Sequence, residues 1–271
     1  MLEKTIPSSG EKIGVVGLGT WRGFDIGNTG GEQENCYRVL ENLVEAGGQV
    51  IDSSPMYGRA EEVTGELLKQ IGKPSKTFIA TKVWTTGKKE GVAQMENSFR
   101  LFKRDVIDLM QIHNLVDWHK HLKTMKAWKK AGRFRYLGYT EYRPKAFKNL
   151  ISCLSAETVD FVQFCYSIEQ RQAEEVMLPF CHNHGIATLI NLPFGGGSLL
   201  SRLSKKPLPA IAIDLGCISW AQFCLKYVIS HPAVTCVIPG TSNPVHMAEL
   251  VEAGSRNIPD QNTRREMANF F

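Results

Sequence analysis

The chain has 271 residues, of which 43% are hydrophobic and 22% are charged, as in globular proteins that bury a large core. Its formal net charge is +5 and it has no block of like charges, which argues against a nucleic-acid partner. A local basic patch could still hold a phosphorylated cofactor. It lacks the apolar stretch of a signal peptide or membrane span, and its seven cysteines include no C-x-x-C pair; we therefore expect a cytoplasmic protein with buried thiols, no membrane segment and no metal site.

Predicted strands and helices alternate along the chain. A small hairpin is expected between Thr5 to Pro7 and the first strand, Ile13 to Val16. In residues 32–46 apolar side chains recur at helical spacing, and Gly47 ends that helix. Further strands are predicted at residues 49–52, 77–82, 106–112, 134–139, 159–164, 186–192 and 234–238. Further helices are predicted at residues 60–70, 90–102, 118–131, 144–154, 169–184 and 218–230.

This alternation of eight strands with helices, without a break in composition, predicts a closed parallel (β/α)8 TIM barrel. We expect it to form a single domain over residues 1–271, with the N-terminal hairpin and a short C-terminal extension. An open doubly wound sheet is the competing architecture, because the glycine run Gly17 to Gly23 is similar to a dinucleotide-binding fingerprint. The third glycine of that run comes one residue late, and no acidic residue follows at the required distance. We therefore interpret the run as a loop over the barrel mouth.

Residues 195–213 form the longest stretch without a predicted element, and they are rich in glycine, serine, lysine and proline. Such a segment is either a linker or a flap. Its position after the seventh strand of a barrel favours a flap that covers a phosphate.

Side chains able to transfer protons follow three neighbouring strands. Asp52 ends the second strand, Lys82 ends the third and His113 follows the fourth, while Tyr57 lies in the loop after Asp52. Each residue alone has an ordinary structural interpretation, as a turn cap, a solvated lysine, a packed histidine or a loop aromatic. Because the carboxyl ends of parallel strands meet at one end of a barrel, their coincidence predicts a common site.

The chemistry of such a group is that of a tuned acid. A free phenol has a pKa of about 10, and an ammonium held close to Tyr57 would lower it by stabilising the phenolate. Asp52 would hold Lys82 charged and oriented, and His113 would hydrogen-bond a carbonyl oxygen. Because this group supplies a proton but no electron pair, it requires a cofactor that donates hydride.

Six segments of the sequence resemble the motifs of the aldo-keto reductase family. They are GLGTW at 17–21, the stretch from Asp52 to Gly58, ATKVW at 80–84, DLMQIHN at 108–114, VQFCYS at 162–167 and VIPGTSNPVHMAEL at 237–250. The resemblance covers nearly the whole chain and implies a (β/α)8 barrel that binds extended NADPH and reduces aldehydes or ketones. It implies that Asp52, Tyr57, Lys82 and His113 form the catalytic tetrad, with Tyr57 as the general acid.

The resemblance also implies which residues contact cofactor and substrate. Gln163 and Thr140 would hold the nicotinamide carboxamide, and Trp21 and Trp84 would line the substrate pocket beside His113. The complete implied cofactor site consists of Gly19, Thr20, Trp21, Asp52, Thr140, Gln163, Pro193, Phe194, Gly195, Gly240, Thr241, Ser242, His246 and Glu249.

Two departures from the family pattern affect the nicotinamide end of that site. Thr140-Glu141 stands in place of a serine-asparagine pair, so one carboxamide contact is missing or comes from a carboxylate. Asn191 stands where a tyrosine usually stacks on the nicotinamide, and Phe194 is the candidate substitute.

Three further departures affect the adenosine end. Gly240 replaces a common lysine, His246 a common arginine and Leu250 a common adenine-contacting asparagine, which leaves Thr241 and Ser242 as hydroxyl donors. Since arginine is permanently charged and histidine is not, fixed positive charge is reduced there. We predict NADPH as the cofactor, with weak discrimination against NADH.

Three other functions compete with this one. The pairs His119/His121 and His182/His184 would suit a metal hydrolase only on a strand, and both lie in predicted helices where such residues point apart. A short-chain dehydrogenase needs a lysine four residues after its tyrosine, which no tyrosine here has. A cofactor-binding regulatory subunit of a membrane channel is the alternative left open, because proteins that resemble this family take that role with the tetrad retained.

The expected substrate is a small-molecule aldehyde or ketone with an apolar or aromatic group. Only a short polar segment follows the last strand, which favours an open pocket. Trp118 is either a third wall of that pocket or a core residue at a helix start. The oligomeric state is not predicted.

Overall fold

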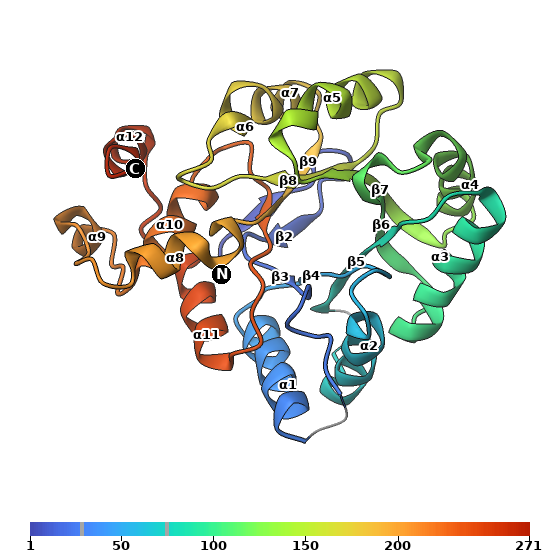
Figure 1. The fold of residues 1–271 in the computed structure, drawn as a ribbon, viewed down its shortest axis with the longest axis horizontal. Coiled ribbons are helices and arrows are strands. Elements are labelled where there is room, and N and C mark those ends of the chain that lie inside the picture. The colour runs from blue at the N-terminus through green and yellow to red at the C-terminus, as the bar shows by residue number, and fades with distance from the viewer. Residues whose placement is uncertain (28–29, 74–75) are drawn as a thin grey trace.

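The computed structural model describes residues 1–27, 30–73 and 76–271, and its centre is a closed barrel of eight parallel strands (Figure 1). Each strand pairs with its sequence neighbour, in the order β10-β9-β8-β7-β6-β5-β4-β3. The strands are β3 (Leu18–Gly19), β4 (Val50–Asp52), β5 (Phe78–Val83), β6 (Ile107–Ile112), β7 (Phe134–Glu141), β8 (Phe161–Cys165), β9 (Ala187–Asn191) and β10 (Cys236–Val237). Parallel bridges from Val16 to Val237 and from Gly19 to Gly240 close the sheet. The predicted barrel is confirmed.

Helices form a ring around these strands (Figure 1). They are α1 (Gly30–Glu45), α2 (Ala60–Ile71), α3 (Lys88–Phe102), α4 (Trp118–Lys130), α5 (Phe147–Ala156), α6 (Gln172–Glu175), α7 (Met177–Asn183), α8 (Ser198–Leu203), α9 (Ala210–Asp214), α10 (Trp220–Ile229), α11 (Pro244–Ala253) and α12 (Gln261–Ala268). Among the described residues, short 3-10 turns lie at His113–Leu115, Pro144–Ala146 and Gly195–Gly197. Within the described residues, no helix is long and apolar enough to cross a membrane.

The first predicted barrel strand, Ile13 to Val16, was only partly right, because Val16 alone of these residues pairs with the barrel. Lys12–Gly14 is strand β2, which pairs antiparallel with β1 (Glu3–Thr5) in the N-terminal hairpin, and the barrel begins with Leu18 and Gly19. The glycine run is therefore partly strand rather than only a mouth loop. A β-carbon at Gly17 would lie 2.6 Å from the Val50 carbonyl oxygen, so glycine is needed there for the two strands to approach.

Two further predictions needed correction, one of a helix and one of an irregular segment. The predicted helix at 169–184 is divided into α6 and α7, with Val176 outside helical geometry between them. Pro179 explains the division, because its ring would clash with the carbonyl of residue 175 in a continuous helix. The stretch 195–213 is not irregular throughout but contains α8 and α9, and its Leu199 and Leu203 are buried against the barrel.

Apolar side chains fill the barrel interior below the strand ends. Ile6 and Ile13 from the hairpin belong to the same buried cluster as Phe78, Tyr136 and Phe161 from the strands. The three aromatic rings contact one another with centroids 5.5 to 5.8 Å apart. The hairpin thus closes the amino end of the barrel, and polar interior residues lie toward the opposite end.

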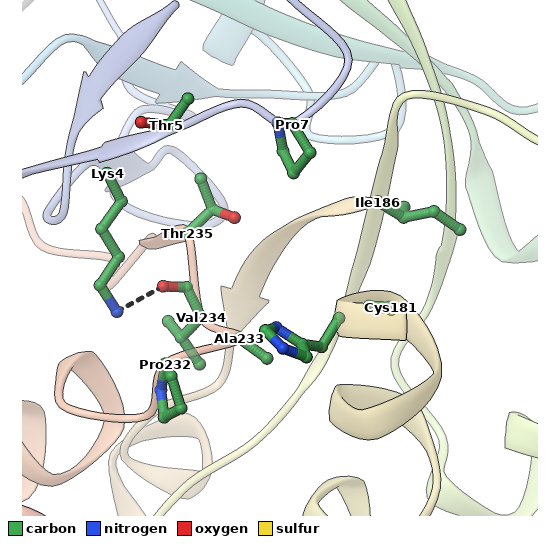
Figure 2. Close-up of a pocket in the computed structure, with 10 residues that line it drawn as sticks. Lys4, Thr5, Pro7, Cys181, Ile186, Pro232, Ala233, Val234 and Thr235 are labelled. Carbon is green, nitrogen blue, oxygen red and sulfur yellow. Dashed lines mark hydrogen bonds between the residues drawn. The ribbon is translucent and has the colours of Figure 1, made fainter. Parts of the chain in front are cut away.

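A cavity of about 290 Å³ lies beside that hairpin, away from the carboxyl ends of the strands (Figure 2). Lys4 reaches into its wall, where the ammonium donates to the carbonyl oxygens of Ile229, His231 and Val234 at 2.7, 2.8 and 2.6 Å. All three ammonium protons are therefore satisfied by the chain itself. Burial lowers the pKa of Lys4 to about 8, and its hydrogen bonds fasten the hairpin to the end of α10 and the loop that precedes β10.

Candidate active site

The carboxyl ends of β4 and β5 place Asp52 and Lys82 in contact inside the barrel mouth. The Lys82 ammonium lies 2.6 Å from Asp52 Oδ2 and donates a second hydrogen bond of 2.6 Å to the Ser53 carbonyl. Lys82 and Asp52 are only 1% and 3% exposed. A buried charge pair requires close partners of this kind, so the position of Lys82 is fixed by the strands.

Tyr57 and His113 lie next to this pair. The Lys82 ammonium is 5.2 Å from the centroid of the Tyr57 ring, and the Tyr57 and His113 rings meet edge to face at 6.1 Å. The structure therefore brings together the four residues that the sequence selected. Tyr57 comes from the loop between β4 and α2, and His113 from the turn that follows β6.

Gly58 allows the chain to turn away directly after Tyr57. Its φ is +58°, and a β-carbon there would lie 2.2 Å from Asp25 Oδ1. The same Asp25 oxygen accepts a hydrogen bond of 3.0 Å from the backbone N–H of Arg59, where α2 begins. Glycine and Asp25 together hold the loop that carries Tyr57.

Burial has opposite effects on the acids and bases of this cluster. It raises the pKa of Tyr57 more than Lys82 lowers it, and Asp52 raises it further, so the net shift is upward. The expected lowering by Lys82 exists but does not dominate. Burial lowers the pKa of Lys82, but Asp52 and Tyr57 raise it by more. Tyr57 therefore stays protonated and Lys82 stays charged near neutral pH.

His113 is neutral for a related reason. Burial, and then the charge of Lys82, lower its pKa to about 3. A neutral imidazole has one N–H donor and one acceptor nitrogen. His113 can therefore hydrogen-bond a carbonyl oxygen without itself carrying charge.

Gln111 is a member of the cluster that sequence reasoning missed. It is fully buried in β6, in register with Lys82, and its Nε2 donates to Asp52 Oδ1 at 3.0 Å. Space for it comes from Gly138 on the next strand, where a β-carbon would lie 3.1 Å from Gln111 Cγ. The available signal was a glutamine in an otherwise apolar strand, two residues before His113 and thus on the same face.

Thr140 and Gln163 lie side by side near the ends of β7 and β8. Thr140 Oγ1 accepts a hydrogen bond of 3.0 Å from the backbone N–H of Asn114. The Gln163 side chain is buried but is hydrogen-bonded by none of the described residues. Asn191, at the end of β9, has an Oδ1 atom that is likewise buried without a partner in the described part of the chain. Two amide groups with free hydrogen-bonding capacity therefore lie on adjacent strands.

Glu141 is buried and already paired. Its two carboxylate oxygens accept hydrogen bonds of 2.8 and 2.7 Å from the Arg143 guanidinium. Farther along the mouth, Pro193 is buried and Phe194 half-buried, and Gly195 takes a φ of +58° at the start of a 3-10 turn. The charge of Glu141 is therefore paired with Arg143, two residues farther along the chain, and is not left for a ligand.

The segment after β10 carries the predicted phosphate contacts. Ser242 and His246 are exposed, Thr241 is half-buried, and Asn243 caps α11 by accepting from the Val245 N–H at 2.9 Å. Gly240 has a structural role, since a β-carbon there would lie 3.2 Å from the Gly19 carbonyl oxygen at the barrel closure.

The remaining predicted cofactor residues have partners within the chain. Thr20 is buried and bonds the Asp52 carbonyl through its backbone N–H and its hydroxyl, at 2.9 and 3.1 Å. Glu249 accepts a hydrogen bond from Ser219, the N-cap of α10. Leu250 is buried in the core.

Arg22 is a second residue that sequence reasoning missed. Its guanidinium lies 4.2 Å from the centroid of the Trp21 ring. A β-carbon on Gly23, the next residue, would lie 3.4 Å from the Ser242 backbone nitrogen. The loop that carries Arg22 therefore packs against the segment that follows β10.

Large apolar side chains are exposed at several strand ends. Trp21, Met56, Trp84 and Tyr142 are each between 41% and 48% exposed, and the Trp84 ring centroid lies 6.3 Å from that of His113. Trp118 is different, because it packs edge-on against the buried Tyr139 ring at 5.9 Å. Trp118 is half-buried at the start of α4, and this contact packs it against the core.

The histidine pairs form no metal site. His121 is buried and its Nε2 lies 2.7 Å from the Thr85 carbonyl oxygen, whereas His119 is exposed. Across residues 1–27, 30–73 and 76–271, no group of three or more histidine, cysteine, aspartate or glutamate side chains could hold a metal ion.

Known proteins similar to this chain were found by sequence and by fold. The chain resembles the aldo-keto reductase YhdN of Bacillus subtilis, with 26% identity over 74% of this chain and 65% of that protein. It resembles an uncharacterized oxidoreductase of Schizosaccharomyces pombe, with 30% identity over 92% of this chain and 84% of that one. The crystal structure of an aldo-keto reductase from Klebsiella pneumoniae in complex with NADPH shares the fold, with a TM-score of 0.83 and 23% identity over 100% of this chain and 96% of that one.

A model of the family described as "Aldo/keto reductase family" matches residues 15–266. That match covers both ends of the barrel and the segment that follows β10. Family membership supports an oxidoreductase. Because this model matches nearly the whole length of the chain, the chain belongs to the aldo/keto reductase family.

Proposed function

We propose that this protein reduces aldehydes or ketones to alcohols with NADPH, and that Tyr57 is the general acid. The observation that carries the proposal is the buried Asp52–Lys82 pair, with its 2.6 Å contact, beside the rings of Tyr57 and His113. An acid, a charge that stabilises its conjugate base and a neutral donor thus converge at one point.

Each residue has a distinct role in the proposed reaction. The Tyr57 hydroxyl gives its proton to the substrate oxygen as that oxygen gains negative charge. Lys82 stabilises the phenolate that remains, and Asp52 holds Lys82 charged and in place. His113 donates a hydrogen bond to the same substrate oxygen, which orients the carbonyl. NADPH, when bound, supplies the hydride that the carbonyl carbon accepts.

The nicotinamide end of the cofactor fits the free amides of the mouth. Gln163 and Asn191 have hydrogen-bonding atoms that no described residue uses, and a carboxamide both donates and accepts. Thr140 lies beside Gln163 and would complete this contact. Glu141 would not take part, because Arg143 occupies its carboxylate.

The phosphate end of the site fits an anion, although the protein has less fixed positive charge there than the family pattern. The N-terminus of α11 has a partial positive charge, and Thr241 and Ser242 offer hydroxyl groups next to it. Arg22 adds a permanent charge from the neighbouring loop. His246 is exposed and adds charge only when protonated, so we propose NADPH as the preferred cofactor with modest discrimination against NADH.

Replacement of Tyr57 by phenylalanine tests this function. Multiple-turnover oxidation of NADPH should be measured with a panel of apolar and aromatic carbonyl compounds. The rate should fall by roughly 10²- to 10⁴-fold, the contribution of a positioned acid, with NADPH affinity retained. Tyr37→Phe, which removes the same hydroxyl from the outer helix α1, should leave the rate unchanged.

Two results would count against the proposal. An unchanged rate in Tyr57→Phe would reject the acid role. A wild-type protein that binds NADPH but oxidises no more than one equivalent with every carbonyl would instead favour a cofactor-binding regulatory subunit.

A further inference from the structure

Ser54 contacts one nitrogen of the His113 imidazole. Its hydroxyl oxygen lies 3.1 Å from His113 Nδ1, and Ser54 and His113 are 0% and 7% exposed. Ser54 belongs to the loop that carries Tyr57, two residues after Asp52. One hydrogen bond therefore ties the loop after β4 to the end of β6.

The direction of this hydrogen bond follows from the partners available. A serine hydroxyl has one proton to donate and two lone pairs. The backbone N–H of Met56 approaches the Ser54 oxygen at 3.4 Å and can only donate. Among the described residues, His113 Nδ1 is the one acceptor that hydrogen-bonds the Ser54 hydroxyl. If Nδ1 carried a proton, the buried hydroxyl would have no acceptor, which costs free energy.

The ring must then carry its proton on the other nitrogen. A neutral imidazole that accepts at Nδ1 has its N–H at Nε2. The Lys82 ammonium nearby disfavours a second proton on the ring. No described residue hydrogen-bonds Nε2, and the ring lies between Tyr57 and Trp84, with centroids 6.1 and 6.3 Å away.

We infer that Ser54 is a positioning residue that fixes the Nε2–H tautomer of His113 and aims this donor at the substrate oxygen. The inference rests on the proposed function, since it assigns a purpose to the donor. It adds that the Ser54 hydroxyl, which is not part of the proposed catalytic tetrad, decides whether His113 presents a donor or an acceptor to the carbonyl. With the proton on Nδ1, a lone pair would face the carbonyl oxygen and repel it.

The tautomer can be read directly by ¹⁵N NMR of protein labelled at histidine, without cofactor or substrate. In the wild type, His113 should show an acceptor-type Nδ1 and a protonated Nε2. Ser54→Ala should shift the ring toward the other tautomer or a mixture, and Ser54→Thr, which keeps the hydroxyl, should restore the wild-type signals. Ser53→Ala is the matched control, because Ser53 is equally buried and its hydroxyl has no partner among the described residues.

Turnover provides the second measurement. Ser54→Ala should lower kcat by about 2- to 10-fold, as expected for one hydrogen bond, and leave NADPH affinity unchanged, with Ser54→Thr recovering most of the rate. A wild-type His113 protonated at Nδ1 would overturn the inference even if Ser54→Ala failed to fold. So would a Ser54→Ala variant that keeps both tautomer and kcat. Absence of carbonyl turnover in the wild type would instead overturn the proposed function, while the NMR measurement still decides the tautomer.

Discussion

The reaction end and the phosphate end of the proposed site are built differently. At the reaction end, Asp52, Lys82 and Gln111 are buried on adjacent strands and bonded to one another at 2.6 to 3.0 Å. At the phosphate end, Ser242 and His246 are exposed on a loop and a helix surface. Strand register holds the first group rigidly, so a change there removes a partner from a buried charge. A change in the second group alters only a solvated interaction, and selectivity for the cofactor should therefore be easier to modify than the chemistry.

Lys82→Met should give the largest effect, because it leaves the Asp52 carboxylate buried without its counter-charge. We expect the free energy of unfolding in urea to fall by about 3 to 5 kcal/mol, as for other broken buried pairs, and turnover to be nearly abolished. Lys73→Met is the matched control: its ion pair with Glu45 is 2.8 Å long but exposed, so its loss should change the stability little. Equal losses of unfolding free energy in the two variants would contradict the comparison, because the buried pair would then stabilise the protein no more than the exposed pair.

His113 should make the protein less stable in acid. Its folded pKa is lowered from 6.5 to about 3, so below about pH 6.5 the unfolded chain binds a proton that the folded chain does not. Its contribution to stability is therefore complete above that pH and is lost as the pH falls toward 3. By about pH 5 the loss should reach roughly 2 kcal/mol.

Urea unfolding at a series of pH values would measure this effect. His113→Gln should flatten the acid side of the stability profile relative to the wild type. His184→Gln, which replaces an exposed histidine, should leave the profile almost unchanged. A His113→Gln profile parallel to that of the wild type would mean that His113 binds its proton in the folded protein.

His246→Arg should give the smallest effect. A permanent charge on the exposed face of α11 should strengthen NADPH binding relative to NADH by about 2- to 5-fold, in the range of an exposed ion pair. Titrations of both cofactors would measure the ratio, and the gain should shrink at high salt. His246→Gln is the neutral control; if it raised the NADPH preference as much as arginine does, charge would not be the cause.

Prediction from sequence succeeded where a residue's surroundings follow from its own strand. Asp52, Lys82 and His113 could be placed at one end of the barrel because parallel strands direct their carboxyl ends to the same side. Gln111 and Ser54 were missed because their importance depends on a partner 59 positions away in each case. The apolar strand around Gln111 indicates that it is buried, but no local pattern identifies the distant partner of either residue.

The assignment of Ile13 to Val16 failed for a different reason. Both the hairpin strand and the true first barrel strand are short and buried, so apolar character alone does not separate them. The distinction lies in which backbone the segment pairs with, antiparallel β1 or parallel β4.

The sequence by itself determined the eightfold alternation of strands and helices and the set of acid and base residues at three strand ends, because local periodicity and strand direction are properties of contiguous segments. Tertiary structure alone decided the hydrogen-bond partners of that set, the pairing of Glu141 with Arg143, and the net rise in the pKa of Tyr57. These depend on burial and on distances of a few ångströms between segments far apart in the chain, which no local pattern specifies.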